Sequence, residues 1–458
     1  MKKVFMWMVL VALAVSLVVV LPLSACKKET VKAEPAEAAE EKTEEVEEVE
    51  EEKAEEVKEE ERAPVTLEFW TVHAEDNPQH KAFKRAAEIV KEKYNITVNV
   101  VSKGNRGFRE LLTASAMSQS GPDIMFNWSG LADIVTSGRQ GLYLPLNDYL
   151  TQDEIDSLAG LSSCTDQDTG DIYGVIYAYN YIALAYNKAI MDEVGIDYNS
   201  FPSKWTYDEF LNVCDKLKTA GVTPFAFGNL EGFYSDWWHS FFLPTYVDKI
   251  EDVIPIYQET PIYKEPFITF CKNWKDFYDK GYYLEGGNTV SIGELWGQFI
   301  NEDAALGVTF PSITSMYIEG MGQEKVGLIE FPAMGNGELS KANPIFGDCM
   351  GVTNWTEHPE EAVLYIKTLI FDPEMVKMFA DMGNLPVCNE YKMSDFPIEN
   401  PEVARFFENH EKMPTYFEGH AFWVKEYSEA TRKFCNMMLM GEISIEDYAQ
   451  EIENAITQ

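Results

Sequence analysis

From residue 65 onward the chain alternates strand patterns with helix patterns, and this alternation restricts the possible folds more than any other feature. Residues 65–70 are apolar at every second position, as in a half-buried strand. Residues 83–94 carry apolar side chains three and four positions apart, as on one face of a helix. Strand patterns recur at residues 96–100 and 124–126. This order predicts the α/β class, with a mostly parallel sheet flanked by helices.

Several helix starts can be read from their capping residues. Asn77 precedes a proline at the first helical position. Thr206 and Glu209 have the spacing of a capping box, in which each side chain bonds the other residue's backbone N–H. Ser444 precedes the last helical pattern. These positions predict helices that begin at residues 78, 207 and 445.

The length and the charge of the chain restrict its organisation and its partners. A chain of 458 residues exceeds the usual size of one hydrophobic core, which favours two lobes. The formal net charge is −39. A field of this sign repels phosphate backbones and anionic lipid headgroups, so we expect no nucleic-acid partner.

The first 26 residues have the pattern of a targeting segment. Lys2 and Lys3 precede an apolar run at residues 4–21, and Leu23-Ser24-Ala25-Cys26 follows it. The pattern resembles a bacterial lipoprotein signal, which implies a signal peptide at residues 1–25 and lipidation of Cys26, with palmitate among the acyl chains. The anchor would hold the chain at the outer face of the cell membrane or in the periplasm. A transmembrane helix is the alternative, because about 18 apolar residues nearly span the hydrocarbon layer.

An acidic segment separates this signal from the first strand. Residues 26–62 contain mostly Glu, Lys, Ala and Val, with Glu in large excess. Such a composition cannot bury enough apolar surface to fold alone, and charge repulsion extends it. We expect a flexible stalk between the anchor and the folded part.

Six cysteines follow Cys26, and none lies in a C-x-x-C pair or has a Cys/His metal spacing. We therefore predict no metal site. An oxidising compartment permits disulfides, and the sequence does not choose among the possible pairings.

Seven segments, taken in order, resemble one family. They are Leu67-Glu68-Phe69-Trp70, Gly121-Pro122-Asp123-Ile124, Leu144-Pro145-Leu146-Asn147-Asp148-Tyr149, Tyr173-Gly174-Val175 through Tyr186-Asn187-Lys188, Trp205-Thr206-Tyr207-Asp208-Glu209-Phe210, Phe346-Gly347-Asp348 before His358-Pro359-Glu360-Glu361-Ala362, and Gly383-Asn384-Leu385-Pro386-Val387. Their order and spacing resemble the family 1 extracellular solute-binding proteins of ABC importers, which include the maltose- and oligosaccharide-binding proteins. The likeness covers nearly all of residues 65–458.

The resemblance implies a type II periplasmic-binding-protein-like fold, with two hinge-linked α/β lobes and a ligand cleft between them. The first lobe would comprise residues 63–180 plus about 345–385, and the second residues 181–344 plus about 386–458. The first hinge crossing would lie near residues 179–183. Ligand would close the lobes, and the closed form would dock on the importer.

The resemblance and the strand ends together give candidate ligand contacts in the first lobe and hinge, because ligands of open α/β folds bind at the carboxyl ends of strands. These candidates are Trp70, His73, Glu75, Asn127, Trp128, Tyr179, Asn180 and Asp348. The family often has an aromatic residue where Asn127 stands, so the choice between Asn127 and Trp128 stays open.

The candidates in the second lobe are mostly aromatic and comprise Tyr234, Asp236, Trp237, Phe310 and Trp423. Flat rings could cover the apolar faces of a sugar, and polar side chains could bond its hydroxyl groups. Packing inside the core is the alternative role for each aromatic residue.

The function implied is capture of a mono- or oligosaccharide and its delivery to the transmembrane subunits of an ABC importer, by a monomer that needs no cofactor and is not an enzyme. Another polar solute, such as a glycerophosphodiester, is an alternative ligand, since Arg106, Arg109 and Arg139 could bind phosphate. A polysaccharide-cleaving lipoprotein is the alternative from another class, because carboxylate pairs are common in a chain with 76 Asp and Glu.

Overall fold

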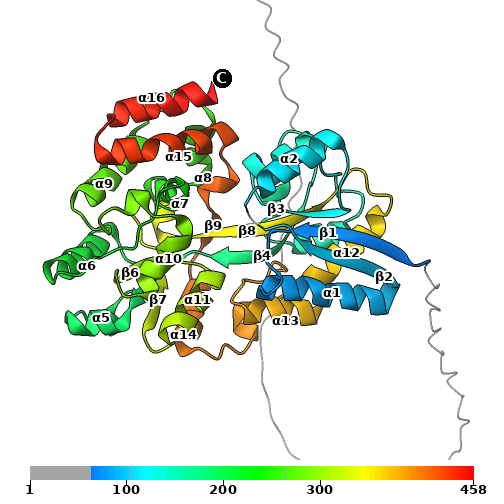
Figure 1. The fold of residues 1–458 in the computed structure, drawn as a ribbon, viewed down its shortest axis with the longest axis horizontal. Coiled ribbons are helices and arrows are strands. Elements are labelled where there is room, and N and C mark those ends of the chain that lie inside the picture. The colour runs from blue at the N-terminus through cyan, green and yellow to red at the C-terminus, as the bar shows by residue number, and fades with distance from the viewer. Residues whose placement is uncertain (1–62, 105, 263, 458) are drawn as a thin grey trace, which may run out of the picture. The chain divides into compact units, whose positions relative to one another are not determined.

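Two β-sheets organise the chain (Figure 1). The computed structural model describes residues 63–104, 106–262 and 264–457. The predicted signal peptide, Cys26 and the predicted acidic stalk lie outside the described residues. Among those described, no helix combines the length and the apolar character needed to cross a membrane.

The first sheet has the strand order β2-β1-β3-β8-β4, and β9 pairs with β8. Its strands are β1 (Val65–Thr71), β2 (Ile96–Ser102), β3 (Ile124–Trp128), β4 (Val175–Tyr181), β8 (Asn343–Val352) and β9 (Thr415–Phe417). The strands β2, β1 and β3 are parallel, as their strand and helix order predicted. The strand β8 runs antiparallel to β3 and β4, so the complete sheet is mixed rather than mostly parallel. The difference arises because β4 leaves this sheet for the second one and β8 returns from it in the opposite direction.

The second sheet is smaller, with the order β6-β5-β7. It contains β5 (Ala183–Asn187), β6 (Leu306–Thr309) and β7 (Val326–Glu330), and both pairings are antiparallel. Only Ile182 separates β4 from β5, so the chain passes from one sheet to the other across a single residue. The lobe boundaries expected from the sequence stay a prediction.

Sixteen α-helices are found among the described residues. They are α1 (Pro78–Tyr94), α2 (Phe108–Ser118), α3 (Thr136–Arg139), α4 (Gln152–Ser157), α5 (Lys188–Glu193), α6 (Tyr207–Thr219), α7 (Phe233–Phe241), α8 (Ile250–Gln258), α9 (Glu265–Asp279), α10 (Ile292–Ile300), α11 (Pro311–Met321), α12 (Pro359–Phe371), α13 (Pro373–Asp381), α14 (Pro401–His410), α15 (Lys425–Met440) and α16 (Ile445–Ile456). Figure 1 shows α1, α12 and α13 beside the first sheet, and α15 and α16 at the top of the view, next to α7 and α9.

Each sheet has its own hydrophobic core. Beside the first sheet, the rings of Phe69 and Phe83 meet edge to face at 5.1 Å. Beside the second, Trp238 and Trp274 stack at 5.6 Å, and both are almost completely buried. Separate cores of this kind permit two rigid bodies to move relative to one another about the connecting strands.

The six cysteines of the described part are buried free thiols. Burial raises the pKa of Cys214 and Cys271 well above the usual value. A thiol held protonated in apolar surroundings is a weak nucleophile, so these residues act as small packing groups.

The predicted helix starts are confirmed. Asn77 accepts a hydrogen bond from the Gln79 N–H at 2.8 Å and caps α1. Thr206 and Glu209 form the predicted capping box at the start of α6. Ser444 caps α16 in the same way.

We expect Thr206→Ala to lower the free energy of unfolding by about 1 kcal/mol, because it removes the side-chain acceptor of the Glu209 N–H. Urea unfolding followed by circular dichroism measures the change. Thr206→Ser keeps the hydroxyl group and should retain nearly the full stability. Equal losses in the two variants would show that the cap does not stabilise the helix.

Candidate functional site

Four half-buried aromatic side chains meet where the two sheets approach one another, and we call them the aromatic cluster: Trp237, Trp296, Phe310 and Phe346. The ring of Trp237 lies 5.6 Å from Trp296 and 6.2 Å from Phe310. Phe310 lies 5.8 Å from Trp296 and 5.7 Å from Phe346. These separations are those of interacting aromatic pairs.

The aromatic cluster draws on both sheets. Trp237 belongs to α7 and Trp296 to α10. Phe310 follows β6 and precedes Pro311, the first residue of α11, so its backbone is extended as proline requires. Phe346 lies on β8, in the first sheet. The contact between Phe310 and Phe346 therefore joins the end of one sheet to the other.

Three polar side chains lie beside the aromatic cluster, and we call them the polar cluster: Asn180, Asp348 and Asn384. The Asn180 amide donates to the Asp348 carboxylate at 3.3 Å. The Asn384 side-chain amide donates to the side-chain Oδ1 atom of Asn180 at 2.8 Å. All three are buried, and the two contacts fix the orientation of the Asn180 side chain.

The strand register places the two clusters on one face. Phe346 and Asp348 are two residues apart on β8 and so project to the same side. Across the ladder, Phe346 pairs with Asn180 and Asp348 pairs with Trp128. Opposite residues of an antiparallel pair share a face, so Trp128 joins this surface.

The choice between Asn127 and Trp128 follows from the same register. Asn127 pairs with Cys349 and projects to the other face. There it is fully buried and donates to the Ser137 hydroxyl at 3.2 Å. Trp128 is half-buried, and the Arg109 guanidinium lies 4.1 Å from its ring centre. We therefore keep Trp128 in the candidate site and remove Asn127.

The environment of Asp348 changes its titration. Burial raises the pKa of Asp348 to about 7, and the hydrogen bond from Asn180 lowers it in part. The carboxyl group is 9% exposed, and its hydrogen-bond partner in the described structure is the neutral amide of Asn180. Near neutral pH this group is therefore present in both protonation states.

Ion pairs lie on each side of this surface, and one contact of His420 joins the two sides. Arg109 on α2 forms an ion pair with Asp133, which lies in the short helix η1 (Leu131–Val135). The His420 Nε2 atom, from the later short helix η8 (Gly419–Ala421), lies 3.0 Å from the Asp133 carboxylate. Arg432 on α15 pairs with Asp236 on α7. Each arginine thus has a carboxylate partner.

The remaining first-lobe candidates lie apart from the aromatic cluster. The Trp70 indole donates to Glu68, and the Lys103 ammonium covers its ring at 3.9 Å. The His73 Nε2 atom lies 3.0 Å from the Tyr177 hydroxyl, and burial lowers the pKa of His73 to about 4. Glu75 is exposed. The described contacts of Trp70 run to Glu68 and Lys103, while His73 also meets Phe126, which packs on Trp128, at 5.5 Å.

Two predicted contacts, Tyr234 and Trp423, are buried in the core beside the second sheet. Tyr234 has no exposed surface and donates to the Ala226 carbonyl at 3.0 Å. Trp423 is also fully buried, against Tyr257 and Tyr427. We remove both from the candidate site, because neither ring has a free face.

Tyr179 and Asp236 are likewise engaged within the protein. The Tyr179 hydroxyl donates to the Ala159 carbonyl, and its ring contacts Phe417 at 5.6 Å. Asp236 is held by Arg432 and by the Ser428 hydroxyl at 3.3 Å. Neither residue therefore presents a free polar group.

Sequence reasoning missed Trp296, Phe346 and Asn384. Phe346 carried a readable signal, because it stands two residues before Asp348 in the Phe346 to Asp348 segment of the family resemblance. Asn384 lies in the Gly383 to Val387 segment of the family resemblance. Trp296 gave no local signal, since its position on an amphipathic helix fits packing equally well.

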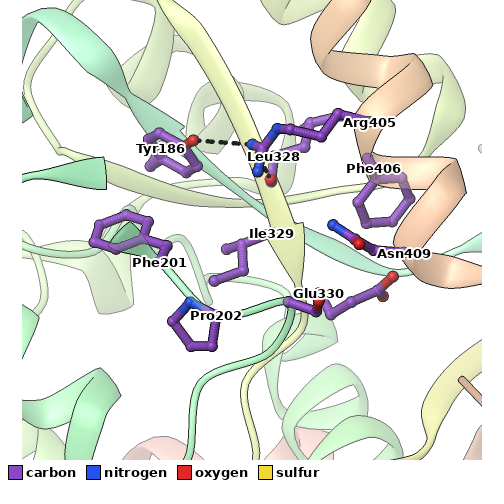
Figure 2. A pocket seen from close by; sticks show the side chains of 10 residues that line it. Tyr186, Phe201, Pro202, Leu328, Ile329, Glu330, Arg405, Phe406 and Asn409 are labelled. Carbon is purple, nitrogen blue, oxygen red and sulfur yellow. Dashed lines mark hydrogen bonds between the residues drawn. The ribbon is translucent and has the colours of Figure 1, made fainter. Parts of the chain in front are cut away.

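A small pocket lies elsewhere, between β7, α14 and the loop around Pro202 (Figure 2). Its volume is about 10 Å³. Figure 2 shows the Arg405 guanidinium and the Tyr186 hydroxyl, 3.2 Å apart, at one end and Glu330 at the other. A space of this size holds about one water molecule and no sugar ring.

Comparison with known families gives one match. A family described as bacterial extracellular solute-binding protein matches residues 84–405. No match is found among curated proteins.

Solved structures share the fold at low sequence identity. A chitin oligosaccharide binding protein is 19% identical and gives a TM-score of 0.71, with 86% of this chain and 98% of that chain covered. A structure from work on xylan utilisation by Caldanaerobius polysaccharolyticus is 18% identical, with a TM-score of 0.71 and coverages of 85% and 99%. The GacH receptor of Streptomyces glaucescens, studied unliganded and with acarbose, is 18% identical, with a TM-score of 0.66 and coverages of 86% and 98%.

Proposed function

Because the chain belongs to the bacterial extracellular solute-binding protein family, we propose that it captures a carbohydrate outside the cytoplasmic membrane and delivers it to an ABC importer. The observation that carries this proposal is the meeting of the aromatic cluster with the polar cluster at the junction of the two sheets. Structural relatives support the ligand class, since their descriptions name chitin oligosaccharide, stachyose, acarbose and raffinose.

The chemistry of a sugar ring matches this surface. Its C–H faces are apolar and pack on flat rings, which Trp237, Phe310 and Phe346 provide. Its hydroxyl groups point outward and need donors and acceptors, which Asn180 and Asp348 provide. Because the rings and the polar side chains lie side by side, a bound sugar can pack its C–H face on the rings while its hydroxyl groups bond Asn180 and Asp348.

The lobes are proposed to close on the ligand. The first lobe comprises residues 63–180 plus about 345–385, and the second residues 181–344 plus about 386–458. The connecting strands bend at the crossing between β4 and β5, and the contact between Asp133 and His420 supports the closed form. The importer would recognise that closed form, and the chain acts as a monomer.

A phosphate-bearing solute fits the site less well. A phosphate clamp needs a free guanidinium group. Arg109 pairs with Asp133, and Arg139 pairs with Asp166 at 2.6 Å. Binding a glycerophosphodiester through Arg109 or Arg139 would require breaking these ion pairs.

The chain is proposed to be held at the membrane through Cys26. We expect Cys26→Ala to abolish incorporation of radioactive palmitate, because the thiol is the attachment atom in lipoproteins whose signal this segment resembles. Gel fluorography of labelled cells measures it. Cys388→Ala, which removes a thiol of the folded part, serves as the control and should label normally. Undiminished labelling of the Cys26→Ala protein would refute the anchor.

Thermal-shift screening of the full chain tests the proposed function. The panel contains mono- and oligosaccharides together with a glycerophosphodiester. A ligand present at one hundred times its Kd should stabilise the fold by about 2.7 kcal/mol and raise the Tm. A carbohydrate that raises the Tm and is recovered without new reducing ends supports a binding protein. A shift with the phosphodiester alone, or reducing ends released from a polysaccharide, would contradict the proposal.

A further inference from the structure

Asp348 differs from the other carboxylates at the junction of the sheets in having no cationic partner. Asp133 has Arg109, and Asp236 has Arg432. In the described structure the Asp348 carboxylate accepts a hydrogen bond from the neutral amide of Asn180. Within the described part of the chain, Asp348 is thus the acidic group of the candidate site whose charge is not compensated.

The surroundings of Asp348 are those in which a cation is favoured. Trp128 lies opposite it on β3 and already has the Arg109 guanidinium over its ring, and Phe346 lies two residues away on the same face. Phe346 continues into the aromatic cluster through Phe310. Aromatic faces attract cations, and a carboxylate in a site with little water attracts them more strongly than an exposed one.

We propose that Asp348 makes the site selective for a carbohydrate that carries a protonated primary amine, that is, an amino sugar with a free ammonium group. This inference rests on the proposed carbohydrate-binding function and names the substrate class within it. The ammonium group would donate to the Asp348 carboxylate and would lie against the ring of Phe346.

Two physical arguments favour an amine over a hydroxyl group at this position. A buried carboxylate without a counter-ion is costly in the free protein, and burial accordingly raises the pKa of Asp348 to about 7. An ammonium group supplies the positive counter-charge that the carboxylate lacks, whereas a hydroxyl group leaves the carboxylate without a counter-ion. The positive charges already present cannot serve, since Arg109 and Arg432 are both engaged with other carboxylates.

Calorimetric titration of the full chain tests the inference with three β-1,4-linked tetramers of equal length, built from glucosamine, N-acetylglucosamine and glucose. The glucosamine tetramer should bind at least about tenfold more tightly than the other two, because it alone carries ammonium groups. In Asp348→Asn this preference should fall to about threefold or less, since the substitution removes the charge and keeps the shape.

Folding of the variant can be checked independently. At pH values between the unfolded-state pKa of Asp348 and about 7, Asp348 keeps its proton in the folded chain and loses it in the unfolded chain. An ionisable Asp348 therefore lowers the free energy of unfolding near neutral pH. Asp348→Asn removes this cost and should melt at or above the temperature of the unmodified chain. Asp303→Asn removes one exposed charge elsewhere and should leave all three affinities unchanged.

The outcomes separate the inference from the function on which it rests. Binding of the glucosamine tetramer with a preference that depends on Asp348 supports both. If the neutral tetramers bind as tightly as the glucosamine tetramer or more tightly, the amine inference is overturned and carbohydrate binding stands. The same holds if Asp348→Asn changes the affinities for all three tetramers equally. Saturable binding of the glycerophosphodiester, with no response to any glycan, overturns both.

Discussion

Replacing Trp423 by alanine is expected to lower the free energy of unfolding by about 3–5 kcal/mol. The indole is fully buried and packs against Tyr257, Tyr427 and His420. Its removal leaves a cavity that the surrounding rings cannot fill without moving. Urea unfolding monitored by circular dichroism measures the loss, and ligand affinity of the folded fraction should stay within about threefold of the unmodified chain.

Trp423→Phe is the matched control, because it keeps an aromatic ring and restores part of the buried volume. It should lose clearly less stability than the alanine variant. A Trp423→Ala protein that remained as stable as the unmodified chain but lost ligand affinity would return this residue to the binding site, as the sequence had suggested.

Replacing Trp237 by alanine should have the opposite effect, weakening carbohydrate binding by about 2 kcal/mol, or roughly thirtyfold in Kd. This side chain is half-buried and packs within the aromatic cluster, where its remaining surface can cover a sugar ring. Phe310→Ala should weaken binding in the same direction. Calorimetric titration measures the affinity, and urea unfolding of the same samples measures stability.

Two comparisons separate a binding role from a packing role for Trp237. Trp237→Phe keeps a flat ring and should retain most of the affinity. The stability lost by Trp237→Ala should be well below that of Trp423→Ala, because a half-buried ring leaves a smaller cavity. Similar losses of stability in the two alanine variants, with affinity unchanged in Trp237→Ala, would show that Trp237 only packs.

The sequence specified the local elements well because their signals are local. Asn77 and the Thr206 capping box each mark a helix start within a few residues, and the structure places helices there. The alternating strands predicted β1, β2 and β3 and their parallel pairing. These features depend on neighbouring residues, which a single sequence displays directly.

The composition of the site depended on contacts that no local pattern encodes. Asn180 and Asp348 are 168 positions apart, and their pairing follows from β8 lying beside β4. The choice between Asn127 and Trp128 required the register of β3 against β8, because a shift of one residue exchanges the two faces. Trp237 and Trp423 both stand in aromatic surroundings, and only three-dimensional packing distinguishes the half-buried ring from the buried one.

The most direct test of the account is a calorimetric titration of the full chain with the carbohydrate that gives the largest thermal shift. The account predicts saturable binding of one glycan per chain, with a Kd of about 1 μM or tighter. It also predicts that the double variant Trp237→Ala/Phe310→Ala abolishes the heat of binding while remaining folded. Full-strength binding by the folded double variant, or the absence of saturable heat with every carbohydrate tested, would contradict it.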